Sequence, residues 1–286
     1  MNKKLTNNIN SFKIPKLILL TGKILQFISN NLAAKFAAKI FATPIKFKVP
    51  ERELMMRKST KNELLEIKSI QKEVMVYSYG FSKKKVLIVH GWSGRGTQLY
   101  QLADKILENQ MMVITFDAPA HGLSTGKTTL MHEFIETIHH LDSKFGSFEA
   151  AIGHSFGGMA LLNTVASGLK INKLVTIGTD NSIPEIMKKF VEKLELNTII
   201  NTKLKNLYKK KYNIDLNSFS SYLNAKKVTV PTLVIHDSED KYVPVSSAFI
   251  IRQNLEKGTL LITNGLGHHK IFKDSLIIQR IIDFIK

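Results

Sequence analysis

The clearest candidate for chemistry is Ser155, in the segment Gly153-His154-Ser155-Phe156-Gly157. This segment follows the apolar run Ala150–Ile152 and precedes Met159–Leu162, which has helical character. A serine between two glycines at a strand-to-helix junction sits on a strained turn that exposes its hydroxyl, where larger flanking residues would collide with neighbouring strands. This context is typical of a nucleophile in acyl transfer, and the alternative is a glycine-rich turn with an incidental serine.

A serine nucleophile needs a base, because a free hydroxyl reacts poorly. In parallel sheets with this kind of turn, the acid and then the histidine follow the serine along the chain. Three histidines follow Ser155: His236, His268 and His269. His236 ends an apolar run, whereas the other two lie in the glycine-rich segment Asn264–His269 after the last predicted strand. We predict His268 as the base, with His269 as the alternative.

The acid that orients the base is expected where the apolar run Thr232–His236 leads into a turn. We predict Asp240, because the residues after it leave room for one helix and one strand that return the chain to the same sheet edge. Asp237 and Asp180, which follows the preceding strand, are the alternatives. Each of these aspartates could instead belong to an ordinary turn or helix cap.

The oxyanion of a tetrahedral intermediate needs two hydrogen-bond donors. We predict the backbone N–H of Phe156, the residue after the nucleophile, as one donor. The backbone N–H of Trp92, in the segment His90–Gly94 after the apolar run Val86–Val89, is predicted as the other. The ring of Trp92 could also serve only in packing or as a pocket wall.

Taken together, these segments resemble the α/β-hydrolase superfamily from about residue 60 to the end, in the order of that superfamily. The segments that carry the resemblance are His90-Gly91-Trp92, Phe116–Ser124, Gly153–Gly157, the Asp237–Asp240 turn and Gly267-His268. Among its members, the chain is similar to bacterial serine hydrolases related to small-molecule esterases.

The resemblance implies an eight-stranded, mostly parallel sheet with a helical cap and no cofactor. Many relatives have glycine in place of Asp237, so two aspartates compete for one role here. Haloalkane dehalogenases and epoxide hydrolases share the layout but use an aspartate nucleophile, and Ser155 argues against them.

The elements that would position these residues are short apolar runs separated by helical stretches. Eight runs are predicted strands: Leu64–Ile70, Glu73–Tyr79, Val86–Val89, Met111–Phe116, Ala150–Gly153, Lys173–Gly178, Thr232–His236 and Leu260–Thr263. The first two are expected to form a hairpin. Repeated strand–helix alternation predicts an α/β fold with a mostly parallel, doubly wound sheet and helices on both faces.

One connection, between Gly178 and Pro231, is too long for a single crossover and has strong helical character. Ser182-Ile183-Pro184-Glu185 combines a capping box with a proline near a helix start. We predict a helical insertion at about residues 181–227 that forms a lid above the carboxyl edge of the sheet, where parallel sheets bind ligands.

Residues 1–50 contain nine lysines and no acidic residue, and we predict a basic helical arm separate from a catalytic domain over residues 51–286. A helix that begins near Pro15 would carry one apolar stripe, formed by Leu17, Leu20, Ile24, Phe27 and Ile28. The arm could pack on the main domain, or it could lie as an amphipathic helix on an anionic membrane.

Composition excludes several classes of function. The 286 residues are 44% hydrophobic and 22% charged, which fits a globular chain. The absence of cysteine excludes disulfides, thiolate metal sites and a cysteine nucleophile. The net charge is +18, but 36 of the 41 basic residues are lysine, whereas proteins that read bases favour arginine, so nucleic-acid binding is not expected.

The sequence therefore predicts a serine hydrolase that cleaves a small-molecule carboxylic ester or thioester through an acyl-enzyme. The predicted triad is Ser155, His268 and Asp240, with no metal and no cofactor. We expect a cytoplasmic location, with peripheral contact of the arm with a membrane as an addition. A non-catalytic ligand-binding or membrane-associated member of the fold is the alternative function.

Overall fold

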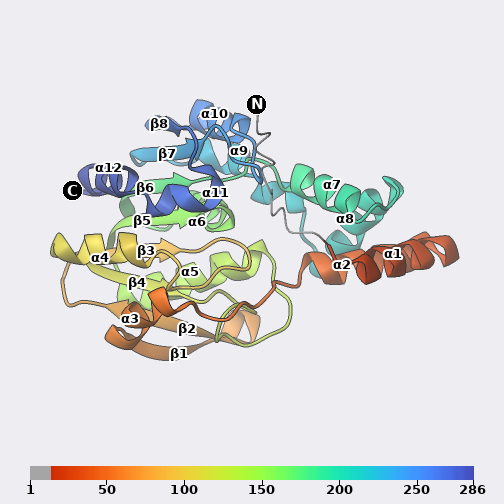
Figure 1. Cartoon of the computed structure of the whole chain (residues 1–286), viewed down its shortest axis with the longest axis horizontal. Coiled ribbons are helices and arrows are strands. Elements are labelled where there is room, and N and C mark those ends of the chain that lie inside the picture. Colours follow the sequence, from red (N-terminus) through yellow and green to blue (C-terminus); the bar gives the residue numbers. More distant parts are fainter. Residues whose placement is uncertain (1–13) are drawn as a thin grey trace, which may run out of the picture.

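The structure, a computed structural model, describes residues 14–286, so the start of the predicted arm lies outside the described residues (Figure 1). One eight-stranded sheet organises the chain, in the order β1-β2-β4-β3-β5-β6-β7-β8. Its strands are β1 (Lys61–Ile67), β2 (Lys72–Tyr79), β3 (Lys85–Val89), β4 (Met112–Phe116), β5 (Phe148–His154), β6 (Ile171–Ile177), β7 (Thr232–Asp237) and β8 (Gly258–Thr263).

The strand pairing confirms the predicted mostly parallel sheet. β2 pairs antiparallel with β1 and with β4, and every other neighbouring pair is parallel. The predicted extent of the first strand to Ile70 is wrong, because residues 68–70 form a 3₁₀ turn, η1 (Lys68–Ile70). Gln71 then takes a left-handed conformation with φ of 53° and closes the hairpin.

Helices cover both faces of this sheet, and alternate residues along each strand face opposite layers. On β3, Val86 and Ile88 pack in the same cluster as α4 (Tyr100–Glu108), η3 (Ile271–Lys273) and α12 (Ser275–Ile285). Leu87 and Val89 pack in the opposite cluster, with α5 (Met131–Phe145), α6 (Phe156–Ala166) and α10 (Ser246–Asn254). The central strands are therefore buried on both sides, as expected for a doubly wound sheet.

Between β6 and β7 lies the predicted helical insertion, formed by α7 (Ile183–Lys193), α8 (Ile199–Tyr212), η2 (Leu216–Phe219) and α9 (Ser221–Ala225). α7 begins as predicted, since the Ser182 hydroxyl accepts a hydrogen bond from the Glu185 N–H at 3.3 Å. Figure 1 shows α7 and α8 together with α1 (Lys16–Ile28) and α2 (Asn30–Phe41) as a helical lobe to one side of the sheet.

Alanines dock the arm on this insertion. Ala33, Ala34 and Ala37 of α2 are fully buried, and their small side chains let α2 approach α8 closely. The Tyr208 hydroxyl of α8 donates a hydrogen bond to the Ala38 carbonyl at 2.8 Å. The described part of the arm therefore contacts the helical insertion, through α2 on α8 and through Gly22 of α1 beside Leu196. Within residues 14–286, no helix is long and apolar enough to cross a membrane.

A helix that the sequence did not reveal, α3 (Glu51–Ser59), connects the arm to the sheet. The buried carboxylate of Glu53 accepts two hydrogen bonds from the Arg95 guanidinium, at 2.6 and 2.7 Å. It also accepts one from the Thr97 hydroxyl at 2.8 Å. Arg95 and Thr97 lie in the loop after β3, so this ion pair holds the loop that contains Trp92.

We expect Glu53→Ala to lower the free energy of unfolding by about 3–5 kcal/mol, because it leaves the largely buried Arg95 guanidinium without its partner. Urea denaturation measures the change. The matched control is Glu108→Ala, which breaks the exposed Lys105–Glu108 pair and should cost less than about 1 kcal/mol. Equal losses for the two variants would contradict the role given to Glu53.

Candidate active site

Ser155 lies on the turn between β5 and α6, with φ of 53° and ψ of −118°. An L-residue rarely adopts this region, so the turn is a strained position that the surrounding structure must hold. The turn leaves the Ser155 side chain partly exposed at the carboxyl edge of the sheet. This is the conformation expected of a serine presented as a nucleophile.

The glycines around Ser155 are required by close backbone contacts. A Cβ on Gly157 would lie 2.3 Å from the Val89 carbonyl oxygen at the end of β3. A Cβ on Gly153 would lie 2.6 Å from the backbone of Gly157. The predicted collision with a neighbouring strand is therefore confirmed for Gly157, whereas a side chain at Gly153 would collide with the start of α6.

His268 and Asp240 are brought together across 28 residues of sequence. His268 lies in the short helix α11 (Gly267–Lys270) rather than in an extended loop, and its Nδ1 is 2.6 Å from Asp240 Oδ2. Because an ionised carboxylate only accepts hydrogen bonds, Nδ1 carries the proton and Nε2 is left as an acceptor. That tautomer is the one a general base requires.

Several donors stabilise the ionised form of Asp240. Its Oδ1 accepts hydrogen bonds from the N–H groups of Tyr242 at 2.8 Å and Val243 at 3.0 Å. Burial raises the pKa of Asp240, but the hydrogen bond from His268 and those from the two N–H groups outweigh burial, and the net pKa is lowered. Asp240 therefore remains a carboxylate that can hold the imidazole.

The residue before Ser155 connects the turn to His268. His154 Nε2 donates a hydrogen bond to the His268 carbonyl at 2.9 Å, and the two ring centroids are 4.7 Å apart. Among the described residues, no hydrogen bond joins the Ser155 hydroxyl to His268. In structures without substrate, catalytic hydrogen bonds are often long and tighten when substrate binds.

The alternative acids have other partners. Asp237 Oδ2 accepts from the Thr263 hydroxyl at 2.6 Å and the Leu266 N–H at 3.0 Å, so it ties the end of β7 to the loop before His268. Asp180 Oδ1 accepts from the N–H groups of residues 181 and 182 just before α7. Within the described chain, neither carboxylate forms a hydrogen bond with a histidine.

The alternative base also differs from the predicted one. The His269 side chain is exposed, and its ring lies against Tyr242 at a centroid distance of 5.2 Å. His236, at the end of β7, donates from Nε2 to the Val243 carbonyl at 3.1 Å. Its Nε2 is 3.6 Å from Asp240 Oδ2, so His236 flanks the acid from the sheet side.

The two predicted oxyanion donors lie on neighbouring segments. A Cβ on Gly91, the residue before Trp92, would lie 3.0 Å from Ser155 Cβ, which places this loop directly beside the serine. The Trp92 ring packs edge-to-face against Phe156, with centroids 5.3 Å apart. In the described part of the chain, the N–H groups of Trp92 and Phe156 have no backbone or side-chain acceptor, so both remain able to bind an oxyanion.

Two buried groups that sequence reasoning did not assign hold this loop. The Asp117 carboxylate accepts from the Tyr77 hydroxyl at 2.9 Å, the Gly96 N–H at 2.7 Å and the Leu123 N–H at 2.8 Å. His90 donates from Nδ1 to the Gly91 carbonyl at 2.7 Å and accepts the Ala118 N–H at Nε2. The only sequence signal for them is a polar residue directly after a buried strand.

Burial keeps several histidines near the site neutral. It lowers the pKa of His90 to about 4 and that of His121 to about 3. Burial is also the main cause that lowers the pKa of His154 and of His236. These four imidazoles therefore carry no charge near neutral pH.

No metal site is evident in residues 14–286, since no group of three or more His, Cys, Asp or Glu side chains there could hold an ion. The arrangement can thus supply a hydroxyl, an acceptor nitrogen and two N–H donors, which are the groups that acyl transfer requires.

Comparison with known proteins gives the same fold. A family profile described as alpha/beta hydrolase fold matches residues 84–209. An esterase from Exiguobacterium antarcticum superposes with a TM-score of 0.62 at 16% identity, covering 79% of this chain and 99% of that one. A bromoperoxidase from Bacillus anthracis superposes with a TM-score of 0.63 at 16% identity, with the same coverage of the two chains. A bacterial membrane phospholipase A superposes with a TM-score of 0.63 at 15% identity, covering 95% of this chain and 98% of that one. A comparison with curated proteins finds no match.

The neutral histidines predict how stability depends on pH. The unfolded chain protonates each imidazole near pH 6.5, whereas folded His121 stays neutral down to about pH 3. The unfolded state thus binds more protons than the folded state in this window. The free energy of unfolding should therefore decrease as the pH is lowered, by about 1.4 kcal/mol per pH unit for each such histidine.

Urea denaturation across this window measures the slope for the wild type and for His121→Asn. We expect the slope of the free energy of unfolding against pH to be smaller in the variant by about 1.4 kcal/mol per pH unit, because one titrating imidazole is removed. His140→Asn, a partly exposed histidine on α5, is the matched substitution measured in parallel. A wild-type free energy that does not change below pH 6.5 would contradict the neutral burial of these imidazoles.

Proposed function

This chain has the α/β-hydrolase fold, and we propose that it is a serine hydrolase that cleaves a carboxylic ester or thioester through an acyl-enzyme. The fold and the esterase among its structural neighbours support hydrolase activity in general. The observation that carries the finer proposal is the 2.6 Å hydrogen bond between His268 and Asp240, beside the strained turn of Ser155.

In the first half-reaction, the Ser155 Oγ attacks the acyl carbon and its proton passes to His268 Nε2. The carbonyl oxygen becomes an oxyanion, which accepts hydrogen bonds from the N–H groups of Trp92 and Phe156. The intermediate then collapses, the bond to the alcohol or thiol breaks, and His268 returns the proton to the leaving group. The acyl group remains on Ser155 as an ester.

In the second half-reaction, a water molecule attacks the acyl-enzyme and gives a proton to His268 Nε2. Collapse of the second tetrahedral intermediate releases the carboxylic acid and returns the proton to Ser155. Asp240 keeps the proton on Nδ1 throughout and stabilises the imidazolium that forms in each step. Its lowered pKa supports this role, since the carboxylate stays ionised where the reaction would run.

The direct test is covalent labelling with a fluorophosphonate, followed by intact mass measurement. We expect one adduct on the wild type and none on Ser155→Ala. His268→Ala should slow labelling and hydrolysis by at least about a thousandfold, because the base is lost. Asp240→Asn should slow them by about a hundredfold to ten-thousandfold, because the wrong tautomer becomes available.

The neighbouring residues supply matched controls. His269→Ala and Asp237→Asn should still be labelled while folded, although Asp237→Asn should also be less stable because its hydrogen bonds hold the loop before His268. If the folded wild type forms no adduct, the serine hydrolase proposal fails and a non-catalytic ligand-binding protein becomes the better explanation.

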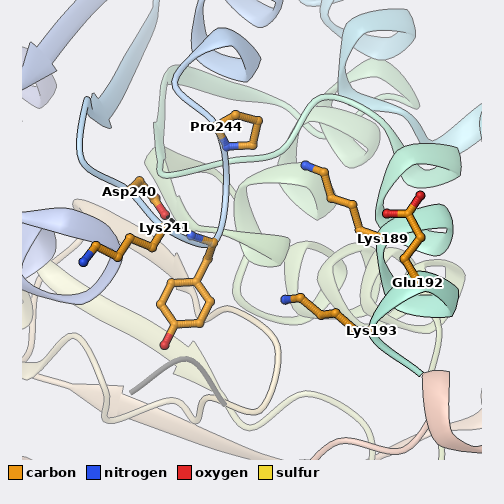
Figure 2. Close-up of a pocket in the computed structure, with 7 residues that line it drawn as sticks. Lys189, Glu192, Lys193, Asp240, Lys241 and Pro244 are labelled. Atoms are coloured by element: carbon orange, nitrogen blue, oxygen red, sulfur yellow. Dashed lines mark hydrogen bonds between the residues drawn. The ribbon is translucent and has the colours of Figure 1, made fainter. Parts of the chain in front are cut away.

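The substrate class is suggested by a cavity of about 480 Å³ between α7 and the turn that carries Asp240. Its walls come from both elements: Lys189, Glu192, Lys193, Asp240, Lys241, Tyr242 and Pro244. In Figure 2, Lys189 and Lys193 extend from α7 toward the turn, whereas Lys241 extends from the turn in the direction away from α7. Among the described residues, no carboxylate forms an ion pair with Lys189 or Lys193.

Two ammonium groups without a carboxylate partner, beside the acid of the proposed triad, favour a substrate with negative charge. An acyl donor whose alcohol or thiol part carries phosphate would place that charge near α7 while its acyl carbon reaches Ser155. In this proposal α7 acts as a lid that also contributes to specificity. A thioester of a phosphorylated carrier such as coenzyme A has this chemistry.

We expect a higher kcat/KM for an acyl-CoA than for a neutral ester of the same acyl chain. The double variant Lys189→Gln/Lys193→Gln should lower kcat/KM for the acyl-CoA by about tenfold to a hundredfold and leave the neutral ester unchanged. Lys188→Gln, an exposed lysine on the same helix that does not line the cavity, is the control. Equal losses for both substrates would remove the anionic preference.

A further inference from the structure

The apolar stripe of α1 faces outward. Its five large side chains occupy one side of the helix over three turns and are more than half exposed: Leu17 (73%), Leu20 (57%), Ile24 (51%), Phe27 (94%) and Ile28 (64%). In a globular protein, such a stripe normally packs against the core. An exposed row of this kind marks a surface that meets a partner.

The stripe is exposed although α1 is docked, because another side of the helix makes the contacts with the lobe. Gly22 is buried, and a Cβ there would lie 3.3 Å from a Leu196 methyl group. The Gln26 side-chain oxygen accepts the Asn197 N–H at 2.7 Å, and Lys23 forms an ion pair with Glu195. The packed side thus holds α1 in an orientation that presents the stripe to the surroundings.

The charges around this stripe are almost all positive. The four helices of the lobe, α1, α2, α7 and α8, contain twelve lysines and two glutamates. Lys16 of α1 and Lys35 and Lys39 of α2 are exposed on the arm itself. A surface that combines exposed apolar side chains with unbalanced lysines is complementary to a bilayer with anionic headgroups.

We propose that α1 is an interfacial helix that docks the helical lobe on an anionic lipid surface. At 13 residues, α1 is shorter than the roughly 20 residues that cross a bilayer, so it lies in the plane of the interface with its stripe among the acyl chains. The lysines contact phosphate headgroups. Because α7 belongs to the same lobe, docking brings the insertion beside the sheet close to the lipid surface (Figure 1).

Flotation of the full chain with vesicles tests this proposal. We expect binding to vesicles of phosphatidylglycerol and phosphatidylcholine, and much weaker binding to phosphatidylcholine alone. Raising the salt concentration from about 0.1 M to about 1 M should weaken binding, because the screening length falls from about 10 Å to about 3 Å. The triple variant Leu20→Ser/Ile24→Ser/Phe27→Ser should bind the anionic vesicles at least about tenfold more weakly.

The chain offers matched controls on a distant turn. Phe81, between β2 and β3, is fully exposed, and Lys83 and Lys84 are exposed beside it. Phe81→Ser should bind like the wild type. Lys16→Gln/Lys35→Gln/Lys39→Gln should weaken binding, whereas Lys83→Gln/Lys84→Gln should weaken it less. Thermal melts confirm folding, which the serine variant should retain because the substituted side chains are exposed.

Two results would overturn the proposal. One is vesicle binding that the triple serine variant leaves unchanged. The other is absence of vesicle binding together with a dimer in sedimentation that the same variant converts to monomer, since the stripe would then bind a second copy of the chain. Ser155→Ala should bind vesicles like the wild type, which separates this proposal from the proposed hydrolase activity.

Discussion

The first turn of α6 lies against the end of β3 at a distance that only a glycine backbone allows. The Val89 carbonyl occupies the space where a side chain at Gly157 would be, so α6 can start close to the loop after β3. This close approach places the loop that contains Trp92 beside Ser155 and Phe156. The strain of the Ser155 backbone is held by the same packing, since β5 and α6 are both fixed in the core.

Hydrogen-bond donors and burial decide which groups around the site are charged. Asp237 and Asp240 both accept several hydrogen bonds and both have a lowered pKa, yet only Asp240 also accepts from an imidazole. The histidines His90, His121 and His154 instead lie where burial dominates and they stay neutral. Asp240 is thus an ionised carboxylate in contact with His268, and the three buried imidazoles nearby add no charge near neutral pH.

The helical lobe combines two surfaces. α7 faces the turn of Asp240 with Lys189 and Lys193, and α1 faces outward with its apolar stripe. Both belong to one packed body, because the alanines of α2 join α1 to the insertion. Substrate charge and lipid contact would therefore act on the same packed group of helices beside the sheet, and a change in the packing of α2 would alter both surfaces.

The sequence by itself was enough to predict the eight strands, their mostly parallel arrangement, the insertion before β7 and the stripe on α1. These features can be predicted from the local spacing of residues, because apolar periodicity and glycine positions follow directly from strand and helix geometry. It also limited the chemistry to one serine, three aspartates and two histidines.

Only the tertiary structure decided which of these side chains meet. Asp240 and His268 are 28 residues apart, and their contact depends on how β7, α10, β8 and α11 pack. Asp237, three residues before Asp240, instead accepts hydrogen bonds from the Thr263 hydroxyl and the Leu266 N–H. The direction of the α1 stripe was likewise undetermined, because periodicity places apolar side chains on one side of a helix but does not say what that side contacts. The small residue Gly22 and the polar contacts to residues 195–197 settle it, and they act only between elements distant in sequence.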